Sequence, residues 1–172
     1  VYTHSIFQNQ VKYLRELFDF KPGELDMPGY PLFALFDIAL GMTSVIPRLD
    51  PSKPAACDPA LLVETMEEYN VTTCQGSPAI WRKVYNYCKD ESIKLDTLKR
   101  LITFGAPIPT ELLQGMFTIM AEGAEIYTPY GATESLPVAI IPGSYLVDHA
   151  AERTIEGAGT CVGKPIKGMD VK

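Results

Sequence analysis

Apolar residues recur along the chain with two periods, one typical of amphipathic helices and the other of short buried strands. The pattern predicts a helix over about residues 4–18, which Thr3 or Ser5 can cap, because apolar side chains from Ile6 to Phe18 fall roughly on one face. The same reasoning predicts helices over residues 31–40, 59–69 (capped by Asp58), 78–88 and 109–122. β-Rich runs predict strands over residues 24–27, 42–47, 71–75, 100–104, 125–130 and 137–141, and the run at 42–47 reads as a buried strand.

Strands and helices alternate over most of the chain. This order predicts an α/β fold built on a mostly parallel sheet with helices on both faces. Ligands of such sheets collect in the loops that follow the carboxyl ends of the strands. Three loops in those places are rich in small residues and begin at Gly76, Gly105 and Gly131. Because glycine lets the backbone approach a ligand closely, we expect the binding site among these loops.

The third loop lies within the stretch "YTPYGATESLPVA" and holds several groups suited to a nucleotide. The ring of Tyr130 can stack on a planar base, and Gly131 allows a tight turn. The Thr133 hydroxyl can donate to a phosphate oxygen, and Glu134 can bind Mg²⁺, a hard cation that prefers oxygen ligands. A tyrosine-glycine turn followed by a capping threonine and a glutamate is also common as a purely structural feature, so the pattern alone leaves both interpretations open.

Charge and cysteine content narrow the class of protein. The chain has 172 residues and a net charge of −6. Because phosphate backbones are bound by basic surfaces, we expect no nucleic-acid partner. The longest apolar stretch, residues 32–46, is short and interrupted by Asp37 and Gly41, so we expect no membrane span. The cysteines lack metal-ligand spacing and predict reduced buried thiols in a cytoplasmic protein: Cys57, Cys74, Cys88 and Cys161.

Four segments, "VYTHS", "LKRLITFGAPIPTEL", "YGATE" and "GTCVGKPIKGMDVK", follow one another in the order and spacing of a known family. In these segments the chain resembles the adenylate-forming superfamily, which includes acyl-CoA synthetases, firefly luciferase and peptide-synthetase adenylation domains. "YGATE" matches the superfamily's tyrosine-glycine-x-threonine-glutamate motif. "FGAPIP" matches the loop that lines its adenine pocket. The resemblance covers essentially the whole chain.

The resemblance implies that two loops of this chain contact ATP or AMP. The adenine would be bordered by one loop and stacked on a ring of the other: Gly105, Ala106, Pro107 and Tyr130. Gly131 and Ala132 would shape the floor near the acyl carbonyl. Thr133 would contact the α-phosphate, and Glu134 would bind Mg²⁺. Residues 33–36 and 75–77 would line the acyl side.

A narrower resemblance is carried by "PLFALFDIALGMTSVIPRLDPSKPAACDPALL", "TPYGATESLPVAII" and "GAGTCVG". These segments are similar to the β-lactone synthetases of bacterial long-chain olefin biosynthesis. That group implies a 2-alkyl-3-hydroxy fatty acid as substrate and other enzymes of the olefin pathway as partners. A fatty acyl-CoA ligase, with coenzyme A as acceptor, is the alternative. A non-catalytic α/β interaction module is the alternative of another class.

The resemblance also implies a domain organisation. We expect residues 1–150 to form a sheet-and-helix subdomain carrying part of the AMP site, and residues 151–172 to begin the next β subdomain. In the family, a lysine-bearing phosphate loop would precede Val1. The ribose-binding aspartate, the hinge and the C-terminal domain would follow Lys172. We therefore expect an internal piece of a longer enzyme that packs against the remaining domains of the same chain and is inactive by itself.

Overall fold

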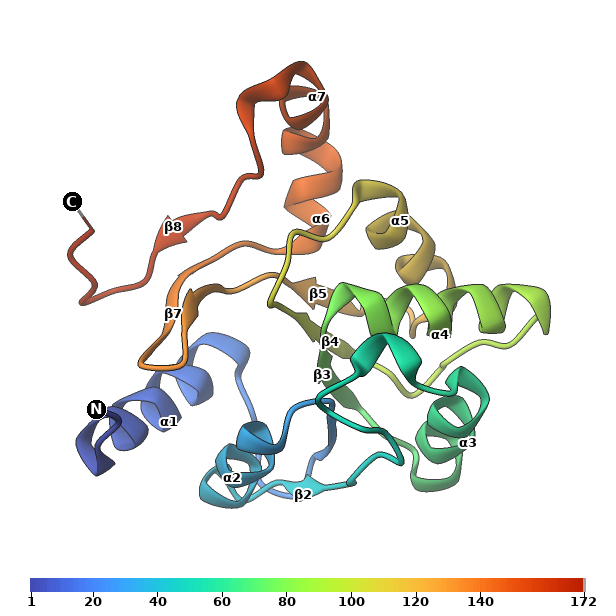
Figure 1. Cartoon of the computed structure of the whole chain (residues 1–172), viewed down its shortest axis with the longest axis horizontal. Coiled ribbons are helices and arrows are strands. Elements are labelled where there is room, and N and C mark those ends of the chain that lie inside the picture. The colour runs from blue at the N-terminus through green and yellow to red at the C-terminus, as the bar shows by residue number, and fades with distance from the viewer. Residues whose placement is uncertain (172) are drawn as a thin grey trace.

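The computed structural model describes residues 1–171 and contains two separate β-sheets (Figure 1). The larger sheet has five parallel strands in the order β2-β1-β3-β4-β5. Its strands are β1 (Leu25–Pro28), β2 (Thr43–Ser44), β3 (Thr73–Gly76), β4 (Arg100–Thr103) and β5 (Glu125–Tyr127). Helices connect most of these strands in sequence, as the alternation of the pattern predicts.

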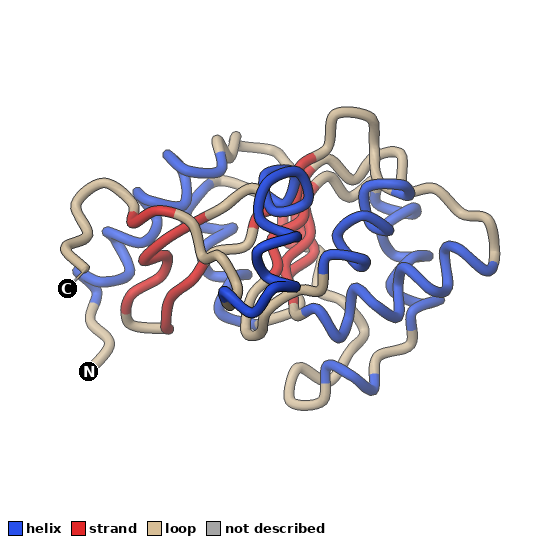
Figure 2. The backbone as a smooth tube through the Cα atoms, turned by 90° about the horizontal axis from the view of Figure 1, so that it is seen from above, coloured by secondary structure: helices blue, strands red, loops and turns tan. Residues whose placement is uncertain are grey.

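Helices cover both faces of the larger sheet, which confirms the predicted fold class. Helices α1 (His4–Phe18) and α2 (Pro31–Leu40) lie on one face. Helices α3 (Pro59–Tyr69), α4 (Pro78–Asp90) and α5 (Thr110–Ile119) lie on the other. Consecutive residues of β4 divide between the two cores, because side chains of a strand alternate: Leu101 packs with α3–α5 and Ile102 with α1 and α2. Figure 2 shows the strands between the two groups of helices.

The smaller sheet is antiparallel and lies beside α1. It consists of β6 (Tyr130–Ala132), β7 (Ser135–Ile140) and β8 (Lys164–Pro165), in the order β6-β7-β8. Short helical segments separate β7 from β8: α6 (Gly143–Tyr145), η2 (Leu146–Ala150), α7 (Ala151–Arg153) and η3 (Thr154–Ala158). A single 3₁₀ turn, η1 (Pro54–Ala56), precedes α3. Both chain ends lie on the side of this small sheet (Figures 1 and 2).

Local sequence signals account for the predicted helix ends. The Oγ1 atom of Thr3 accepts a hydrogen bond from the Ile6 amide at 3.3 Å, so Thr3 caps α1. Asp58 caps α3 in the same way by accepting from the Ala60 amide at 3.0 Å. Gly41 ends α2 in the left-handed conformation, with φ of 79°. The starts of α1 and α3 and the end of α2 confirm the sequence-based assignments.

The structure corrects four details of the predicted elements. The run at 42–47 is not a buried strand, because β2 has only two residues and forms the edge of the sheet, where Ile46 is 67% exposed. Residues 125–130 form two strands of different sheets, since the chain turns after Tyr127. The run at 137–141 belongs to the antiparallel sheet rather than to the parallel one. Helix α5 ends at Ile119, three residues before the predicted end at residue 122.

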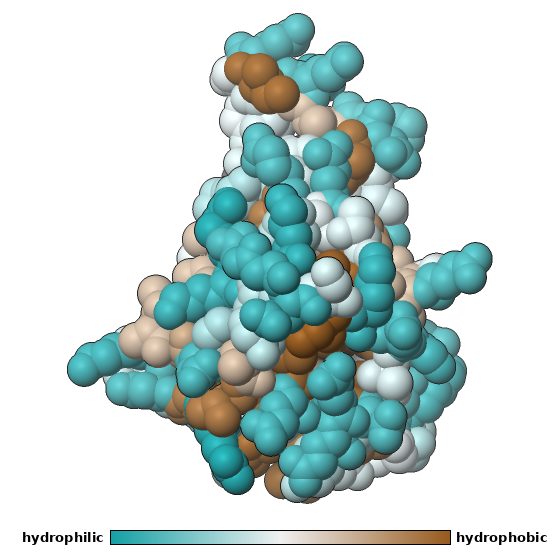
Figure 3. Space-filling view, turned by 90° about the vertical axis from the view of Figure 1, so that its right-hand side faces the viewer, coloured by the Kyte–Doolittle hydropathy of each residue, from teal (hydrophilic) through white to brown (hydrophobic). Residues whose placement is uncertain are grey.

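The face of the molecule formed by α3 and α4 is mainly polar, and Figure 3 shows mostly hydrophilic side chains there. Within residues 1–171 none of the helices combines the length and apolar character needed to cross a bilayer. Cys57, Cys74 and Cys88 are buried free thiols, as predicted. Cys161 is exposed, which contradicts the prediction for that residue, because it lies in the irregular segment before β8 rather than in a packed element.

Candidate functional site

The three small-residue loops leave the same edge of the parallel sheet. The register pairs Gln75 of β3 with Ile102 of β4, and Ile102 with Tyr127 of β5. Gly105 and Tyr130 each lie three residues beyond this matched row. Because all three strands run in the same direction, the loops after them emerge at their common carboxyl end, where ligands of such sheets bind.

The predicted tyrosine-to-glutamate motif forms a β-hairpin. Tyr130, Gly131 and Ala132 make up β6, and Ala132 pairs with Ser135, so that Thr133 and Glu134 form the turn. All five motif residues are exposed, and the Tyr130 side chain is 57% exposed. A Cβ atom on Gly131 would lie only 2.5 Å from the carbonyl oxygen of Ser135, so the close approach of the two strands requires glycine here.

The second predicted loop rests on an aromatic cluster. Gly105 has φ of +90°, a conformation that other residues rarely adopt, and it is followed by the exposed residues Ala106 and Pro107. The preceding residue, Phe104, stacks on Tyr30 with ring centroids 5.1 Å apart and packs on Phe33 at 4.7 Å. The rings hold the start of the loop.

The positions expected on the acyl side have different environments. Phe33 and Phe36 are buried in the core under α2, with 4% and 1% of their surface exposed. Leu35, between them, is 55% exposed. Gln75 and Ser77 are also buried, and Ser77 stands at the N-cap position of α4 without a capping side-chain hydrogen bond. The side chains of Phe33 and Phe36 therefore serve the core packing in this chain.

The exposed groups of the hairpin suit a nucleotide and a magnesium ion. Among residues 1–171, no hydrogen bond or ion pair occupies the Thr133 hydroxyl or the Glu134 carboxylate. The described part of the chain contains no group of three or more His, Cys, Asp or Glu side chains that could hold a metal by itself. A single carboxylate fits Mg²⁺, which is usually held by one or two carboxylates together with water and substrate phosphates.

Two carboxyl groups lie buried together under α2, and the sequence analysis did not predict that they would meet. Asp26 of β1 and Asp37 of α2 are both fully buried, and the Nε2 atom of Gln75 donates to Oδ2 of Asp26 at 2.6 Å. Desolvation, followed by the charge of Asp37, raises the pKa of Asp26 well above its usual value. Desolvation by burial also raises the pKa of Asp37, to about 6. Both Asp37 carboxyl oxygens and Oδ1 of Asp26 are buried without a hydrogen-bond partner among the described residues.

A second residue that the sequence did not single out is Gln10. It is 3% exposed on α1, and its Nε2 atom donates to the carbonyl oxygen of Thr133 at 2.9 Å. The one available sequence signal was a glutamine on the same helical stripe as the buried Leu14 and Phe18. For the acid pair the signal was a carboxylate set between Phe36 and Ile38 in an apolar helix.

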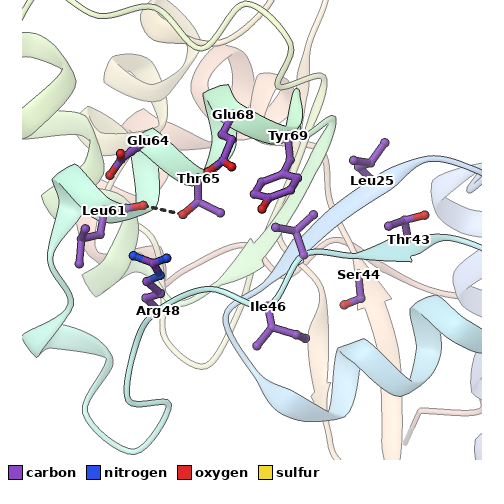
Figure 4. A pocket seen from close by; sticks show the side chains of 11 residues that line it. Leu25, Thr43, Ser44, Ile46, Arg48, Leu61, Glu64, Thr65, Glu68 and Tyr69 are labelled. Carbon is purple, nitrogen blue, oxygen red and sulfur yellow. Dashed lines mark hydrogen bonds between the residues drawn. The ribbon is translucent and has the colours of Figure 1, made fainter.

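The described cavities lie away from the hairpin. A hollow of about 470 Å³ borders the edge strand β2 and α3, with Arg48, Glu64 and Glu68 among its lining residues (Figure 4). A smaller one, of about 170 Å³, lies between the second loop and the η2–η3 segment and is lined in part by Pro107. None of the other predicted site residues lines either of these two cavities. The predicted nucleotide groups therefore form an open surface in this chain.

A known family of enzymes matches the part of the chain that holds most of the parallel sheet and the exposed hairpin at its carboxyl edge. Residues 30–172 match the family of AMP-binding enzymes. The match covers most of the chain and includes the loop at Gly105 and the whole hairpin. The chain belongs to the AMP-binding enzyme family.

Curated relatives within this class are similar over the full chain. The chain is 42% identical to the olefin β-lactone synthetase of Xanthomonas campestris and 40% identical to that of Stenotrophomonas maltophilia, each over 172 residues. It spans about 30% of the length of these two relatives. It is also 36% identical to a long-chain-fatty-acid–CoA ligase of Thermus thermophilus over 83 residues, which is 48% of this chain and 15% of that protein.

Solved structures of adenylation enzymes share the fold. The nonribosomal peptide synthetase FmoA3, in a form bound to α-methyl-L-serine-AMP, superimposes with a TM-score of 0.80 and 21% identity over 96% of this chain and 18% of that chain. The N-terminal domain of FACL13 from Mycobacterium tuberculosis gives a TM-score of 0.67 with 20% identity over 86% of this chain and 37% of that chain. At these identities the likeness concerns the fold alone.

Proposed function

We propose that this chain is part of an ATP-dependent enzyme that activates a fatty acid as its acyl-adenylate. The observation that carries the proposal is the exposed hairpin from Tyr130 to Glu134 within the AMP-binding match. Its ring, hydroxyl and carboxylate have free binding capacity at the carboxyl end of the sheet. The whole protein's reaction is inferred, because this chain spans about 30% of its relatives' length.

Different residues of this chain would contact different parts of the nucleotide. Gly105, Ala106 and Pro107 would border the adenine, and Tyr130 would stack on its face. Gly131 and Ala132 would shape the floor near the acyl carbonyl, where glycine allows close approach. Thr133 would donate to an α-phosphate oxygen, and Glu134 would hold Mg²⁺.

The first step is attack of the fatty acid carboxylate on the α-phosphorus of ATP. A bond forms between the carboxylate oxygen and this phosphorus, the bond to the bridging oxygen of the β-phosphate breaks, and pyrophosphate leaves. Because an anion approaches a polyanion, the step needs donors and positive charge placed where negative charge develops. Magnesium, when bound, supplies that positive charge. Thr133 and Glu134 contribute by fixing the positions of the α-phosphate and of the metal.

For the second step we propose closure of a β-lactone. The 3-hydroxyl oxygen of a 2-alkyl-3-hydroxy fatty acid attacks the activated carbonyl, the carbonyl–oxygen bond to AMP breaks, and the hydroxyl proton is released. Both reacting groups belong to one molecule, so orientation by the pocket is the main requirement. The full-chain identity of 42% and 40% to two olefin β-lactone synthetases supports this reaction. Olefin-pathway enzymes are the corresponding proposed partners.

A fatty acyl-CoA ligase is the second candidate, and the 36% identity to the Thermus thermophilus ligase over 83 residues favours it. The two candidates differ in the acceptor of the acyl group. The test incubates the whole protein with ATP, Mg²⁺ and a 2-alkyl-3-hydroxy fatty acid, with and without coenzyme A, and measures AMP and lactone. Our proposal predicts both products without coenzyme A. If product forms only when coenzyme A is present, and that product is the acyl-CoA thioester, the lactone assignment is wrong.

A further inference from the structure

Gln10 is an unusual residue for the stripe of α1 that it occupies. The buried residues of this helix are Gln10, Leu14 and Phe18, which follow one another at intervals of four. The other two are apolar and pack in the core under α1 and α2. A primary amide buried at such a place is costly unless its N–H and C=O groups find partners. Its presence in an apolar stripe points to a role in hydrogen bonding rather than in packing.

Both ends of the Gln10 amide are engaged. Its Nε2 atom donates to the carbonyl oxygen of Thr133 at 2.9 Å, and its Oε1 atom accepts a hydrogen bond from the hydroxyl of Tyr2. A carbonyl oxygen can only accept a hydrogen bond, so the Thr133 carbonyl must face the Nε2 end of the amide, and the Tyr2 hydroxyl donates to the Oε1 end. The result is a chain of two hydrogen bonds from Tyr2 through Gln10 to the hairpin turn.

The bond to Thr133 acts where the hairpin is least constrained. The last strand pair before the turn joins Ala132 to Ser135, and the register between Tyr130 and Ala132 is irregular. The peptide that links Thr133 to Glu134 therefore lies outside the ladder. Since a peptide is planar, holding the Thr133 carbonyl also fixes the orientation of the Glu134 amide and the place where the Glu134 side chain begins.

We propose that Gln10, hydrogen-bonded to Tyr2, is a positioning residue for the phosphate- and magnesium-binding turn. This assignment rests on the function proposed above for Thr133 and Glu134. Gln10 does not touch the substrate in this account. It acts through the Thr133 carbonyl, which lies 123 residues further along the chain. Helix α1 thereby places the two ligand-binding side chains relative to the parallel sheet.

The test measures ATP–pyrophosphate exchange that depends on added fatty acid. It compares the whole protein with its variants at a series of Mg²⁺ concentrations. Gln10→Met keeps the length of the side chain and its fit to an apolar stripe but removes both hydrogen bonds. We expect kcat to fall on the order of 10- to 100-fold, as for a misplaced catalytic group. The Mg²⁺ concentration at half-maximal rate should rise several-fold. The KM for the fatty acid should stay within about two-fold, because the acyl side is untouched.

Gln8→Met is the matched control, because Gln8 is an exposed glutamine of the same helix. It should leave all three quantities unchanged. Tyr2→Phe is a second variant at an exposed residue, and it releases one end of the amide without removing it. It should shift kcat and the Mg²⁺ midpoint in the same direction by a smaller factor, and it decides the matter if Gln10→Met does not fold.

The outcomes separate this assignment from the proposed function. If the wild-type protein exchanges pyrophosphate and Gln10→Met matches it in kcat and Mg²⁺ midpoint, the positioning role is wrong and the function stands. If only the melting temperature of Gln10→Met changes, the residue is merely structural and the assignment is again wrong. Absence of fatty-acid-dependent exchange in the wild-type protein overturns the proposed function and this assignment together.

Discussion

The buried pair of Asp26 and Asp37 makes the stability of the chain depend on pH. Both folded-state pKa values are raised, so between the ordinary carboxyl pKa and the folded value the native state binds more protons than the unfolded state. The free energy of unfolding must then decrease as the pH rises through this window. For Asp37 the window runs from 3.8 to about 6. The contribution of Asp37 to the free energy of unfolding is fully favourable below this pH window and is lost above it.

Asp37→Asn removes one titrating group while keeping the size of the side chain. At about 1.36 kcal/mol per pKa unit, the rise of the Asp37 pKa from 3.8 to about 6 corresponds to roughly 3 kcal/mol over the full range. About half of this change falls between pH 5 and pH 8, because the lower part of the window lies below pH 5. The variant also removes the charge that, after desolvation, contributes most to raising the pKa of Asp26. The variant should therefore lose less stability than the wild type as the pH rises.

The assay is urea unfolding of the chain at pH 5, 6, 7 and 8, followed by the fluorescence of Trp81, its single tryptophan, which is 1% exposed. We expect the difference in unfolding free energy between variant and wild type to shift in favour of the variant by at least about 1 kcal/mol between pH 5 and pH 8. Asp90→Asn, a change of the same kind at an exposed residue, serves as control. Parallel stability–pH curves for Asp37→Asn and wild type would refute the reasoning.

Three further changes give expected outcomes. Gly131→Ala places a Cβ atom 2.5 Å from the Ser135 carbonyl oxygen; the hairpin must shift, and we expect on the order of a 10-fold lower kcat in steady-state kinetics of the whole protein. Thr3→Ala removes the cap on the Ile6 amide and should cost about 0.5–2 kcal/mol in urea unfolding. Leu62→Ala empties a site that is 0% exposed and should cost about 2–5 kcal/mol in the same assay; a smaller loss would mean that the α3 core collapses around the gap.

The sequence predicted those parts of the fold that local chemistry controls. Helices α1, α2 and α3 begin and end at the expected residues, because Thr3, Asp58 and Gly41 are caps whose effect depends only on their immediate neighbours. Three of the four corrected elements are strands. Whether the run at 42–47 lies in the middle or at the edge of a sheet depends on partners distant in sequence, and local pattern carries no information on them. The division of residues 125–130 between two sheets has the same origin.

The candidate site was predictable to the extent that it lies in contiguous motifs. Tyr130 to Glu134 form one hairpin, so their grouping follows from sequence order. The residues that support the site come from elsewhere in the chain. Gln10 reaches Thr133 across 123 positions, and Asp26 meets Gln75 across 49. Polar residues within apolar patterns were the available sign, and they identify a buried polar group without naming its partner.

The central claim is that the hairpin holds the phosphates and magnesium during carboxyl activation. The most direct test is fatty-acid-dependent ATP–pyrophosphate exchange with the Glu134→Gln variant of the whole protein. The matched control is Glu122→Gln, a change of the same kind at an exposed residue of the loop before β5. We predict robust exchange in the wild type and in the control, and a fall on the order of 10²-fold in Glu134→Gln, with saturation shifted to higher Mg²⁺. Undiminished exchange in Glu134→Gln at low Mg²⁺ would contradict the claim.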